Sequence, residues 1–320
     1  MTELVVEPSA PSSTDAAIVT ENLGRSFGAK TALDGFDVAI PKGKVTALVG
    51  PNGAGKTTLL LILAGLLAPG RGRALVGGFD PTTHPYDVHR SLGWMPDFFG
   101  TYDGLTLTEY LELFAALYDV PVAERSARSR ELLALVELED KAGDPVHTLS
   151  RGQKQRLGFA RTIVHRPAIL LLDEPASGLD PRARVALRDL VRDQARQGVS
   201  VVVSSHILSE LEEMSDLVVF ADRGRCRGIF TMDQLHTSGA ALGRVWRFRA
   251  LDAGRLLEGL RSADPDAVLQ PDGGVAVTLH SDEAAAETVA RLVGEGIKLV
   301  EVAPVRGSLE GYFMSMDEGS

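Results

Sequence analysis

A glycine-rich turn between an apolar segment and a helical pattern constrains the fold of this 320-residue chain more than any other feature. The turn fits the pattern G-x-x-x-x-G-K-[ST] and consists of Gly50, Pro51, Asn52, Gly53, Ala54, Gly55, Lys56, Thr57 and Thr58. The apolar stretch VTALV precedes it, and apolar residues at helical spacing follow it from residue 59 to 67. Glycines let successive backbone N–H groups and the start of a helix approach phosphate oxygens closely. The sequence therefore predicts a phosphate-binding loop, in which Lys56 contacts the β- and γ-phosphates of a nucleotide and Thr57 binds Mg²⁺.

A second pattern places two adjacent acids at the end of an apolar strand. Residues 169–172 are Ile-Leu-Leu-Leu, and Asp173 and Glu174 follow them. At such a position one acid can hold a metal ion while its neighbour faces a water molecule. We expect Asp173 to bind Mg²⁺ and Glu174 to act as a general base toward that water.

The order of strand and helix patterns predicts an α/β fold for residues 17–235. The strands are apolar throughout rather than at every second position, and they alternate with helical patterns. This arrangement indicates a mostly parallel sheet that is covered on both faces. Residues 1–16 are rich in Pro, Ser and Ala and are expected to be a disordered extension.

Residues 236–320 are expected to form a separate, small α+β domain. Their patterns follow the order βαββαβ, which is the ferredoxin-like order. Trp246 and Phe248 are expected to form an apolar strand face. The helix residues expected to cover that face are Leu256, Leu257, Leu260, Val289, Leu292 and Val293. A last helix, expected to pack on this domain or on a partner subunit, contains Leu309, Tyr312, Phe313 and Met316. The patterns after residue 206 carry no further catalytic motif. The domain is therefore expected to regulate or stabilise a pair of such chains without contributing to catalysis.

Composition narrows the possible partners. The net charge of −10 argues against broad binding to nucleic acid, which relies on clustered Lys and Arg. The single cysteine, Cys226, excludes an internal disulfide. The longest apolar run, 59–68, is about half of the ~20 residues that a transmembrane helix needs, and the start of the chain lacks the pattern of a secretory signal. We therefore expect a cytoplasmic protein that reaches a membrane only through a partner.

Residues 149–156 carry the most specific string in the chain, Leu-Ser-Arg-Gly-Gln-Lys-Gln-Arg. It resembles the signature LSGGQ-x-Q-R of the ATP-binding cassette (ABC) ATPases, and the resemblance extends over residues 18–235. Arg151 stands where that signature has a glycine, a form similar to that of ATPases serving drug, lipid and polysaccharide exporters. Ser150 and Gly152 keep the local chemistry, because they open a helix whose N–H groups can bind a γ-phosphate.

The resemblance implies an architecture and further site residues. The implied fold is a RecA-like phosphate-loop domain with antiparallel β and helical subdomains. Phe27 matches the residue that stacks on adenine, and His206 matches the histidine that contacts the γ-phosphate. Asp97 stands where the family has a glutamine, and it is a weak candidate for a Mg²⁺ ligand.

The resemblance also implies partners. Two copies of the chain would pack head to tail as a homodimer, each ATP being bound with Mg²⁺ between them. The residues that would contact the ATP of the other copy are Ser150, Arg151, Gly152, Gln153 and Asp180. The pair would sit on separate transmembrane permease subunits, peripheral to the inner face of the cell membrane.

These features predict the ATP-hydrolysing motor of an exporter, and two alternatives stay open. An importer ATPase can carry a similar small C-terminal domain. Soluble ABC ATPases of DNA repair, ribosomes or iron–sulfur assembly fit less well. The chain has one cassette, no coiled-coil insertion and no zinc-spaced cysteines, and the iron–sulfur type has no such C-terminal domain.

Overall fold

The computed structural model describes residues 15–98, 100, 102, 104–238, 244–262, 264, 267–270, 273–279 and 281–304. Its contacts divide the chain into two compact units, Met1–Phe230 and Thr231–Ser320. The division falls slightly before the predicted boundary between residues 235 and 236. Residues 1–14 of the predicted extension lie outside the described residues. The first strand, β1 (Ala16–Phe27), begins at Ala16, where it pairs with β2 (Lys30–Pro41).

A six-stranded sheet forms the centre of the first unit, with the strand order β5-β6-β7-β3-β8-β9. The neighbouring pairs from β5 to β8 are all parallel. Every residue of β3, β6 and β7 is buried, as expected for parallel strands covered on both faces. The bounds are β3 Val45–Val49, β5 Leu92–Met95, β6 Ile169–Asp173, β7 Ser200–Ser204, β8 Leu217–Asp222 and β9 Arg225–Thr231.

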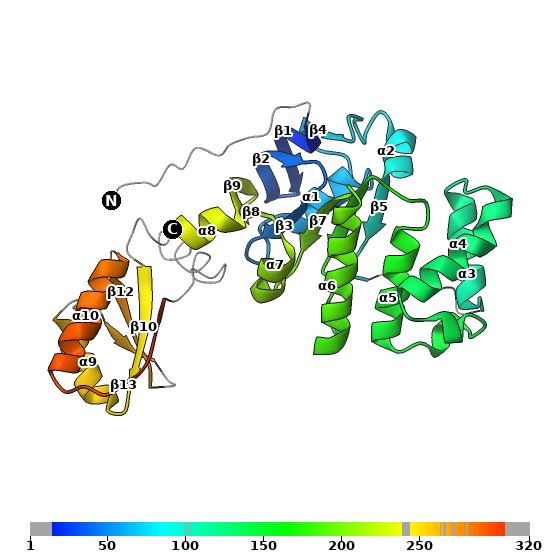
Figure 1. Cartoon of the computed structure of the whole chain (residues 1–320). Helices are drawn as coiled ribbons and strands as arrows, with labels where there is room; N and C mark the ends of the chain where they lie inside the picture. Colours follow the sequence, from blue (N-terminus) through cyan, green and yellow to red (C-terminus); the bar gives the residue numbers. More distant parts are fainter. Residues whose placement is uncertain are drawn as a thin grey trace. The chain divides into compact units, whose positions relative to one another are not determined.

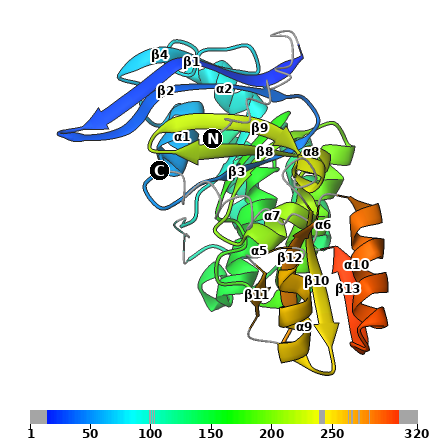
Figure 2. The same cartoon turned by 90° about the vertical axis from the view of Figure 1, so that its left-hand side faces the viewer.

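A second, antiparallel sheet has the order β2-β1-β4, with β2 at Lys30–Pro41 and β4 at Arg71–Val76. Helix α1 (Lys56–Leu63) lies between this sheet and the central one (Figure 2). Phe36 of β2, Leu60 of α1 and Leu171 of β6 belong to one buried core. The helical pattern predicted to residue 67 is too long, because Gly65 adopts a left-handed φ of 69° that ends the helix.

The other helices of the first unit lie at the ends and faces of the central sheet. Helices α3, α4 and α5 form a group beyond β5, and α6 and α7 lie beside the sheet (Figure 1). The bounds are α2 Pro85–Ser91, α3 Leu107–Leu117, α4 Val122–Leu135, α5 Arg151–Thr162, α6 Pro181–Arg196 and α7 Leu208–Met214, with short 3₁₀ turns at Glu139–Lys141 and Val146–Thr148.

The second unit contains α8 (Met232–Ser238) and an antiparallel sheet with the order β11-β12-β10-β13. Its elements follow one another as β10 Arg244–Ala250, α9 Ala253–Arg261, β11 Val268–Leu269, β12 Val275–Leu279, α10 Asp282–Gly294 and β13 Leu299–Pro304. Phe248 is fully buried in a core with Leu256 and Leu292. Val293 was expected there but is 57% exposed, because one residue along a helix turns the side chain by about 100° from Leu292. The predicted last helix, with Leu309 to Met316, lies outside the described residues.

Candidate functional site

The phosphate-binding loop connects β3 to α1, as the sequence predicts, and its glycines are sterically required. Gly53 and Gly55 adopt φ values of 87° and 99°, which side-chain-bearing residues rarely adopt. A Cβ atom on Gly55 would lie 2.4 Å from the carbonyl oxygen of Ala32. A Cβ atom on Gly50 would lie 2.1 Å from the carbonyl oxygen of Ala221. The loop can therefore keep this path only with glycine at these positions.

Lys56 is the first residue of α1, and its side chain folds back over the loop. Its Nζ donates hydrogen bonds to the carbonyl oxygens of Gly50, at 2.6 Å, and Pro51, at 3.2 Å. Burial lowers the pKa of this ammonium group, and the negative charges of Glu174 and Asp173 act in the opposite direction. The cation is thus held between the loop and the two acids that follow β6.

The two acids occupy different environments although they are adjacent in sequence. Asp173 ends β6 and is buried, and its Oδ1 accepts a hydrogen bond from the hydroxyl of Ser204 at 2.5 Å. Glu174 adopts a left-handed φ of 50°. Its backbone N–H lies 3.1 Å from the carbonyl oxygen and 3.2 Å from the hydroxyl oxygen of Ser204. Since β6 and β7 are parallel neighbours, the end of β7 orients both acids.

His206 follows β7 and contacts Glu174 directly. The Nδ1 atom of His206 lies 2.7 Å from Oε2 of Glu174, and its backbone N–H donates to the same oxygen at 3.3 Å. A proton on Nδ1 is therefore donated to the carboxylate. The His206 side chain is 64% exposed, so the other edge of the ring is accessible to a ligand.

A cavity of about 370 Å³ joins most of the predicted ATP-binding residues. The predicted residues that line it are Phe27, Asn52, Gly53, Gly55, Lys56, Thr57, Thr58, Asp97, Asp173 and Glu174. Lys30 and Ala32 also line it. Ala54 is instead buried in the core, and Gly50 and Pro51 take part through the carbonyl oxygens that bind Lys56.

Phe27 lies at the edge of this cavity and is 49% exposed, while the guanidinium carbon of Arg25 lies 5.1 Å from its ring centroid. An exposed ring at the edge of a polar cavity suits stacking on a flat base. The contact with Arg25 restrains the ring.

The oxygen atoms in the cavity suit a magnesium ion. Thr57 supplies a hydroxyl, and Asp173 and Asp97 supply carboxylates, which are the hard ligands that Mg²⁺ prefers. Asp97 is exposed, lines the cavity and follows β5 in the sequence. Mg²⁺ commonly takes only one or two protein ligands and completes its shell with water and phosphate oxygens, so this small donor set fits it.

The predicted trans contacts form a second group that does not line this cavity. Ser150 caps α5 in a capping box: its hydroxyl accepts from the N–H of Gln153 at 3.3 Å, and Oε1 of Gln153 accepts from the N–H of Ser150 at 3.0 Å. Asp180 caps α6, because its Oδ1 accepts from the N–H of Ala183 at 3.0 Å. Within one chain, Ser150 and Asp180 therefore serve as the N-cap residues of α5 and α6.

Ser204 is a residue of the candidate site that the sequence reasoning did not single out. It is fully buried and contacts both acids through its hydroxyl. The available signal was its place at the end of an apolar strand, two residues before His206. Serine is common at strand ends, so the spacing alone does not distinguish it.

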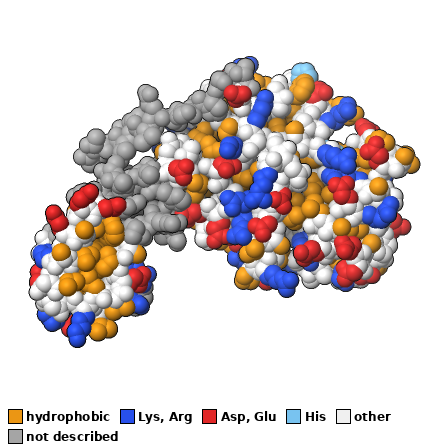
Figure 3. Space-filling model, viewed as in Figure 1, with side chains coloured by type: hydrophobic (Ala, Val, Ile, Leu, Met, Phe, Trp, Pro, Cys, Tyr) orange, Lys and Arg blue, Asp and Glu red, His pale blue; other side chains and the backbone are white. Residues whose placement is uncertain are grey.

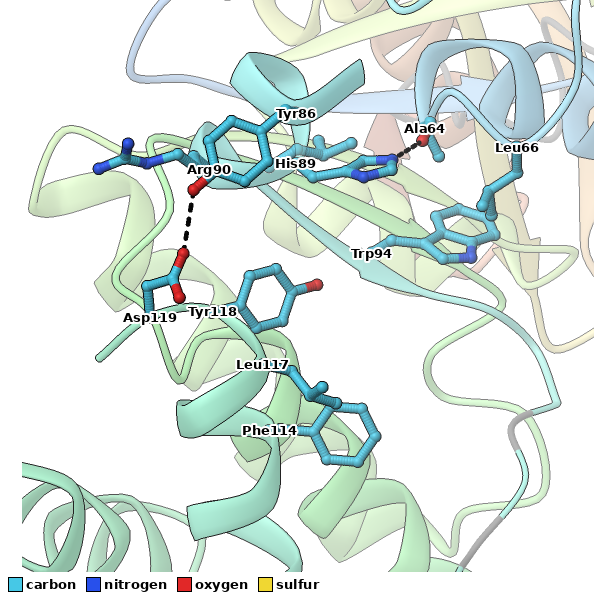
Figure 4. Close-up of a pocket in the computed structure, with 11 residues that line it drawn as sticks. Ala64, Leu66, Tyr86, His89, Arg90, Trp94, Phe114, Leu117, Tyr118 and Asp119 are labelled. Carbon is cyan, nitrogen blue, oxygen red and sulfur yellow. Dashed lines mark hydrogen bonds between the residues drawn. The ribbon is translucent and has the colours of Figure 1, made fainter. Parts of the chain in front are cut away.

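A second cavity of about 330 Å³ lies between α2, β5 and α3, away from the phosphate-binding loop (Figure 4). Aromatic and aliphatic side chains dominate it, among them Trp94, Phe114 and Leu117. The hydroxyl of Tyr86 donates to Asp119 at 3.0 Å, which joins α2 to the end of α3. We call this cavity the apolar groove.

Comparisons with known proteins agree with this geometry. The family model described as ABC transporter matches residues 33–177. A doxorubicin resistance ATP-binding protein of Mycobacterium tuberculosis is 31% identical over 311 residues, which cover 94% of each chain. A probable multidrug ABC transporter ATP-binding protein of Escherichia coli is 42% identical over 207 residues, but the aligned region spans only 36% of that relative.

A solved structure, that of an ATP-binding subunit of an ABC transporter, has a TM-score of 0.64 and 30% sequence identity. The match covers 69% of this chain and 92% of that chain. The phosphate-binding loop, the signature and these similarities together show that the chain belongs to the family of ABC transporter ATP-binding proteins.

Proposed function

We propose that this chain binds ATP with Mg²⁺ and hydrolyses it, and that it powers export of a substrate through a separate permease. The observation that carries the proposal is the pair of Glu174 and His206, joined at 2.7 Å beside the cavity that contains Lys56. Hydrolysis at a γ-phosphate needs a cation on the phosphates and a base for the attacking water. The first unit holds candidates for both.

Each residue has a distinct role in this proposal. Lys56 would exchange its two carbonyl contacts for phosphate oxygens, which accept from an ammonium group more strongly than neutral carbonyls do. The carboxylate of Glu174 would accept a proton from the attacking water. Ser204 would hold the backbone N–H of Glu174, and His206 would orient its carboxylate toward that water. Bound Mg²⁺, held by Thr57 and Asp173, would neutralise charge on the phosphates. Asp97 is proposed as a further ligand of that ion.

The signature segment is proposed to act on the ATP of a second copy. Ser150 and the first N–H groups of α5 lie outside the cavity of their own chain, yet a helix start is a favourable place for a phosphate. A head-to-tail homodimer would bring the signature of one copy to the phosphate-binding loop of the other. Asp180, at the start of α6, would approach the same interface.

The apolar groove supports a protein partner for the first unit. Leu66, Tyr86 and Leu117 line it and are 57%, 59% and 65% exposed, which is unusual for large apolar side chains on one surface region. No described helix is long and apolar enough to cross a membrane. We propose that a cytoplasmic segment of the permease occupies the groove and places the chain on the inner face of the cell membrane. Export is favoured because the Mycobacterium relative is named as a drug resistance protein.

Nucleic acid is not proposed as a partner. On the face drawn in Figure 3, Lys and Arg side chains are interspersed with Asp and Glu, and the whole chain carries a net charge of −10. A phosphate backbone is instead bound by clustered positive charge.

The second unit is proposed to be a ferredoxin-like accessory domain. The antiparallel strand order β11-β12-β10-β13 and the two helices α9 and α10 support this fold. Its own buried core around Phe248 supports an independent domain. We propose that it regulates or stabilises the homodimer and takes no part in hydrolysis.

The test of hydrolysis is Glu174→Gln. The amide cannot take a proton from water, so we expect ATP turnover to fall by about 10²-fold or more while ATP still binds. The ATP-bound pair should then accumulate, and size-exclusion chromatography with Mg²⁺ and ATP should show a dimer. Glu139→Gln, an exposed change in a short 3₁₀ turn, is the matched control and should leave turnover unchanged. Turnover within a few-fold of wild type in Glu174→Gln would remove Glu174 from the role of base.

The test of the permease contact is Leu117→Glu. A charge in the apolar groove should weaken docking, so less of the chain should sediment with membranes of its own cells, while ATP turnover of the purified chain stays the same. Val122→Glu is the control, because Val122 is 77% exposed on α4 and does not line the groove. Equal membrane association of the two variants would show that the groove is not the docking surface.

A further inference from the structure

Arg151, the residue that departs from the usual signature, contacts the loop that follows Glu174. Its Nη2 donates a hydrogen bond to the hydroxyl of Ser177 at 3.2 Å. Arg151 begins α5 and Ser177 lies between β6 and α6, so the contact joins two elements that are 26 residues apart in sequence. We call residues 175–180 the post-strand loop.

Gly178 shows how closely the arginine lies on this loop. Gly178 has a φ of 72°, and a Cβ atom built on it would lie 2.4 Å from both Cζ and Nε of Arg151. The planar guanidinium therefore rests on the backbone of Gly178, in space that a side chain at 178 would occupy. Next to it, a Cβ atom on Gly152 would lie 3.4 Å from Cδ2 of Leu179, so the loop also leaves little room for a larger residue at the start of α5.

Hydrogen bonds connect the post-strand loop to Glu174 at its start and to Arg184 of α6 at its end. At its start, the N–H of Ser177 donates to the carbonyl oxygen of Glu174 at 3.0 Å. At its end, the carbonyl oxygen of Leu179 accepts from Nε of Arg184 at 2.9 Å. Nη1 of Arg184 lies 3.0 Å from Oε1 of Glu210 in α7, the helix that follows His206. A displacement of the loop would therefore be transmitted to Glu174 and to the segment that carries His206.

We propose that Arg151 is a positioning residue that couples the two ATP sites of the homodimer. This inference rests on the proposed function, in which the segment from Ser150 to Gln153 contacts the ATP of the partner copy while Glu174 serves the ATP of its own copy. When the start of α5 engages the partner's ATP, Arg151 moves with it and sets the post-strand loop, and hence Glu174, in its own site. A single exposed hydrogen bond contributes little stability by itself. The packing of the planar guanidinium on Gly178 is what fixes the orientation of the Arg151 side chain.

The test uses Arg151→Lys, Ser177→Ala and the double variant. Lysine keeps the positive charge beside the signature but lacks the planar fork that lies on Gly178 and reaches Ser177. We expect each single variant to lower kcat for ATP by about three- to tenfold with KM little changed, because the phosphate-binding loop is intact. The Hill coefficient for ATP should fall toward one. The double variant should be no slower than the slower single variant, since both substitutions remove the same contact.

Arg192→Lys is the control, because Arg192 is an exposed arginine farther along α6. Its ATP turnover should match that of wild type.

A second readout does not depend on hydrolysis. The N–H groups of Ser177 and Leu179 donate to the carbonyl oxygens of Glu174 and Ala176. Their amide hydrogen exchange should be several-fold faster in Arg151→Lys than in Arg192→Lys, with or without ATP. The coupling role would be overturned if Arg151→Lys and Ser177→Ala both kept the kcat, the Hill coefficient and the hydrogen exchange of wild type. The proposed function would still stand in that case. Additive losses in the double variant would also overturn the coupling role, because they would show that Arg151 acts through its charge on the partner's ATP. A wild-type chain that hydrolyses no ATP would instead refute the proposed function, and the exchange measurement would still test the contact.

Discussion

At the scale of single residues, two histidines show how surroundings decide a role. His206 is exposed and contacts Glu174. His165 is largely enclosed, its ring is stacked on Tyr118 with centroids 3.8 Å apart, and its Nε2 lies 3.1 Å from the carbonyl oxygen of Leu92. Burial lowers the pKa of His165 from 6.5 to about 4. His165 is therefore a neutral structural residue at neutral pH.

This burial predicts a pH dependence of stability. Between pH 6.5 and about 4 the unfolded chain binds a proton at His165 and the folded chain does not, so the free energy of unfolding decreases as the pH falls through this window. The loss is at most about 3 kcal/mol and is complete below the folded pKa. We expect His165→Gln to be less sensitive than wild type when urea unfolding is compared at pH 7.5 and pH 5, since glutamine does not titrate. His84→Gln, at an exposed histidine, is the control, and an equal pH response in all three proteins would contradict the prediction.

At the scale of elements, the same capping box begins two helices with different tasks. Thr106 and Glu109 cap α3, and Ser150 and Gln153 cap α5, with both reciprocal hydrogen bonds present in each case. Each box follows the sequence pattern S/T-x-x-E/Q, which satisfies N–H groups that the first helical turn leaves without partners. The box on α3 stabilises the start of that helix, whereas the box on α5 also orients the signature segment.

This difference can be measured with matched substitutions. Thr106→Ala and Ser150→Ala should each lower the free energy of unfolding by about 1 kcal/mol, because each removes one cap. Only Ser150→Ala should also lower ATP turnover, since its hydroxyl is proposed to reach the partner's ATP. Urea unfolding and steady-state ATP hydrolysis check the two effects separately. Similar turnover in both variants would mean that Ser150 is a helix cap and no more.

At the scale of the whole molecule, the candidate site and the second hydrophobic core belong to different units. The first unit contains the cavity that Lys56 and the other predicted ATP-binding residues line, and it also contains Glu174 and His206. This unit has its own hydrophobic core. The second unit has a separate core around Phe248, Leu256 and Leu292. Neither core includes residues of the other, so the first unit is expected to fold without the second.

A chain that ends at Ser238 tests this division. It should bind ATP with a dissociation constant within about twofold of the full chain, because the cavity and the hydrophobic core around it are retained. Its turnover at low protein concentration should fall if the second unit stabilises the homodimer, and raising the concentration should restore it. Calorimetry and concentration-dependent hydrolysis measure the two effects. A folded truncated chain that fails to bind ATP would refute the division of labour.

The sequence by itself determined the local features of this protein. The spacing of Gly53, Gly55 and Lys56 between an apolar strand and a helix determines the loop, because Gly53 and Gly55 tolerate the left-handed backbone that the turn requires. The continuous apolar strands predicted the parallel sheet, and the acids that follow Leu172 were placed correctly at a strand end. Such features depend on neighbours within a few residues, so a linear pattern contains them.

Only the tertiary structure decided the contacts between distant segments. The register of β6 against β7 brings Ser204 to Asp173 and His206 to Glu174, and no local pattern specifies contacts between residues that are 31 and 32 positions apart. The contact of Arg151 with Ser177 likewise depends on where α5 packs. The early end of α1 was mispredicted because the apolar spacing continues past Gly65, whose left-handed backbone ends the helix. The exposure of Val293 was mispredicted because apolar spacing does not reveal which face the rest of the fold will cover. Burial and partners are properties of the packed chain, since they depend on side chains that the sequence places far apart.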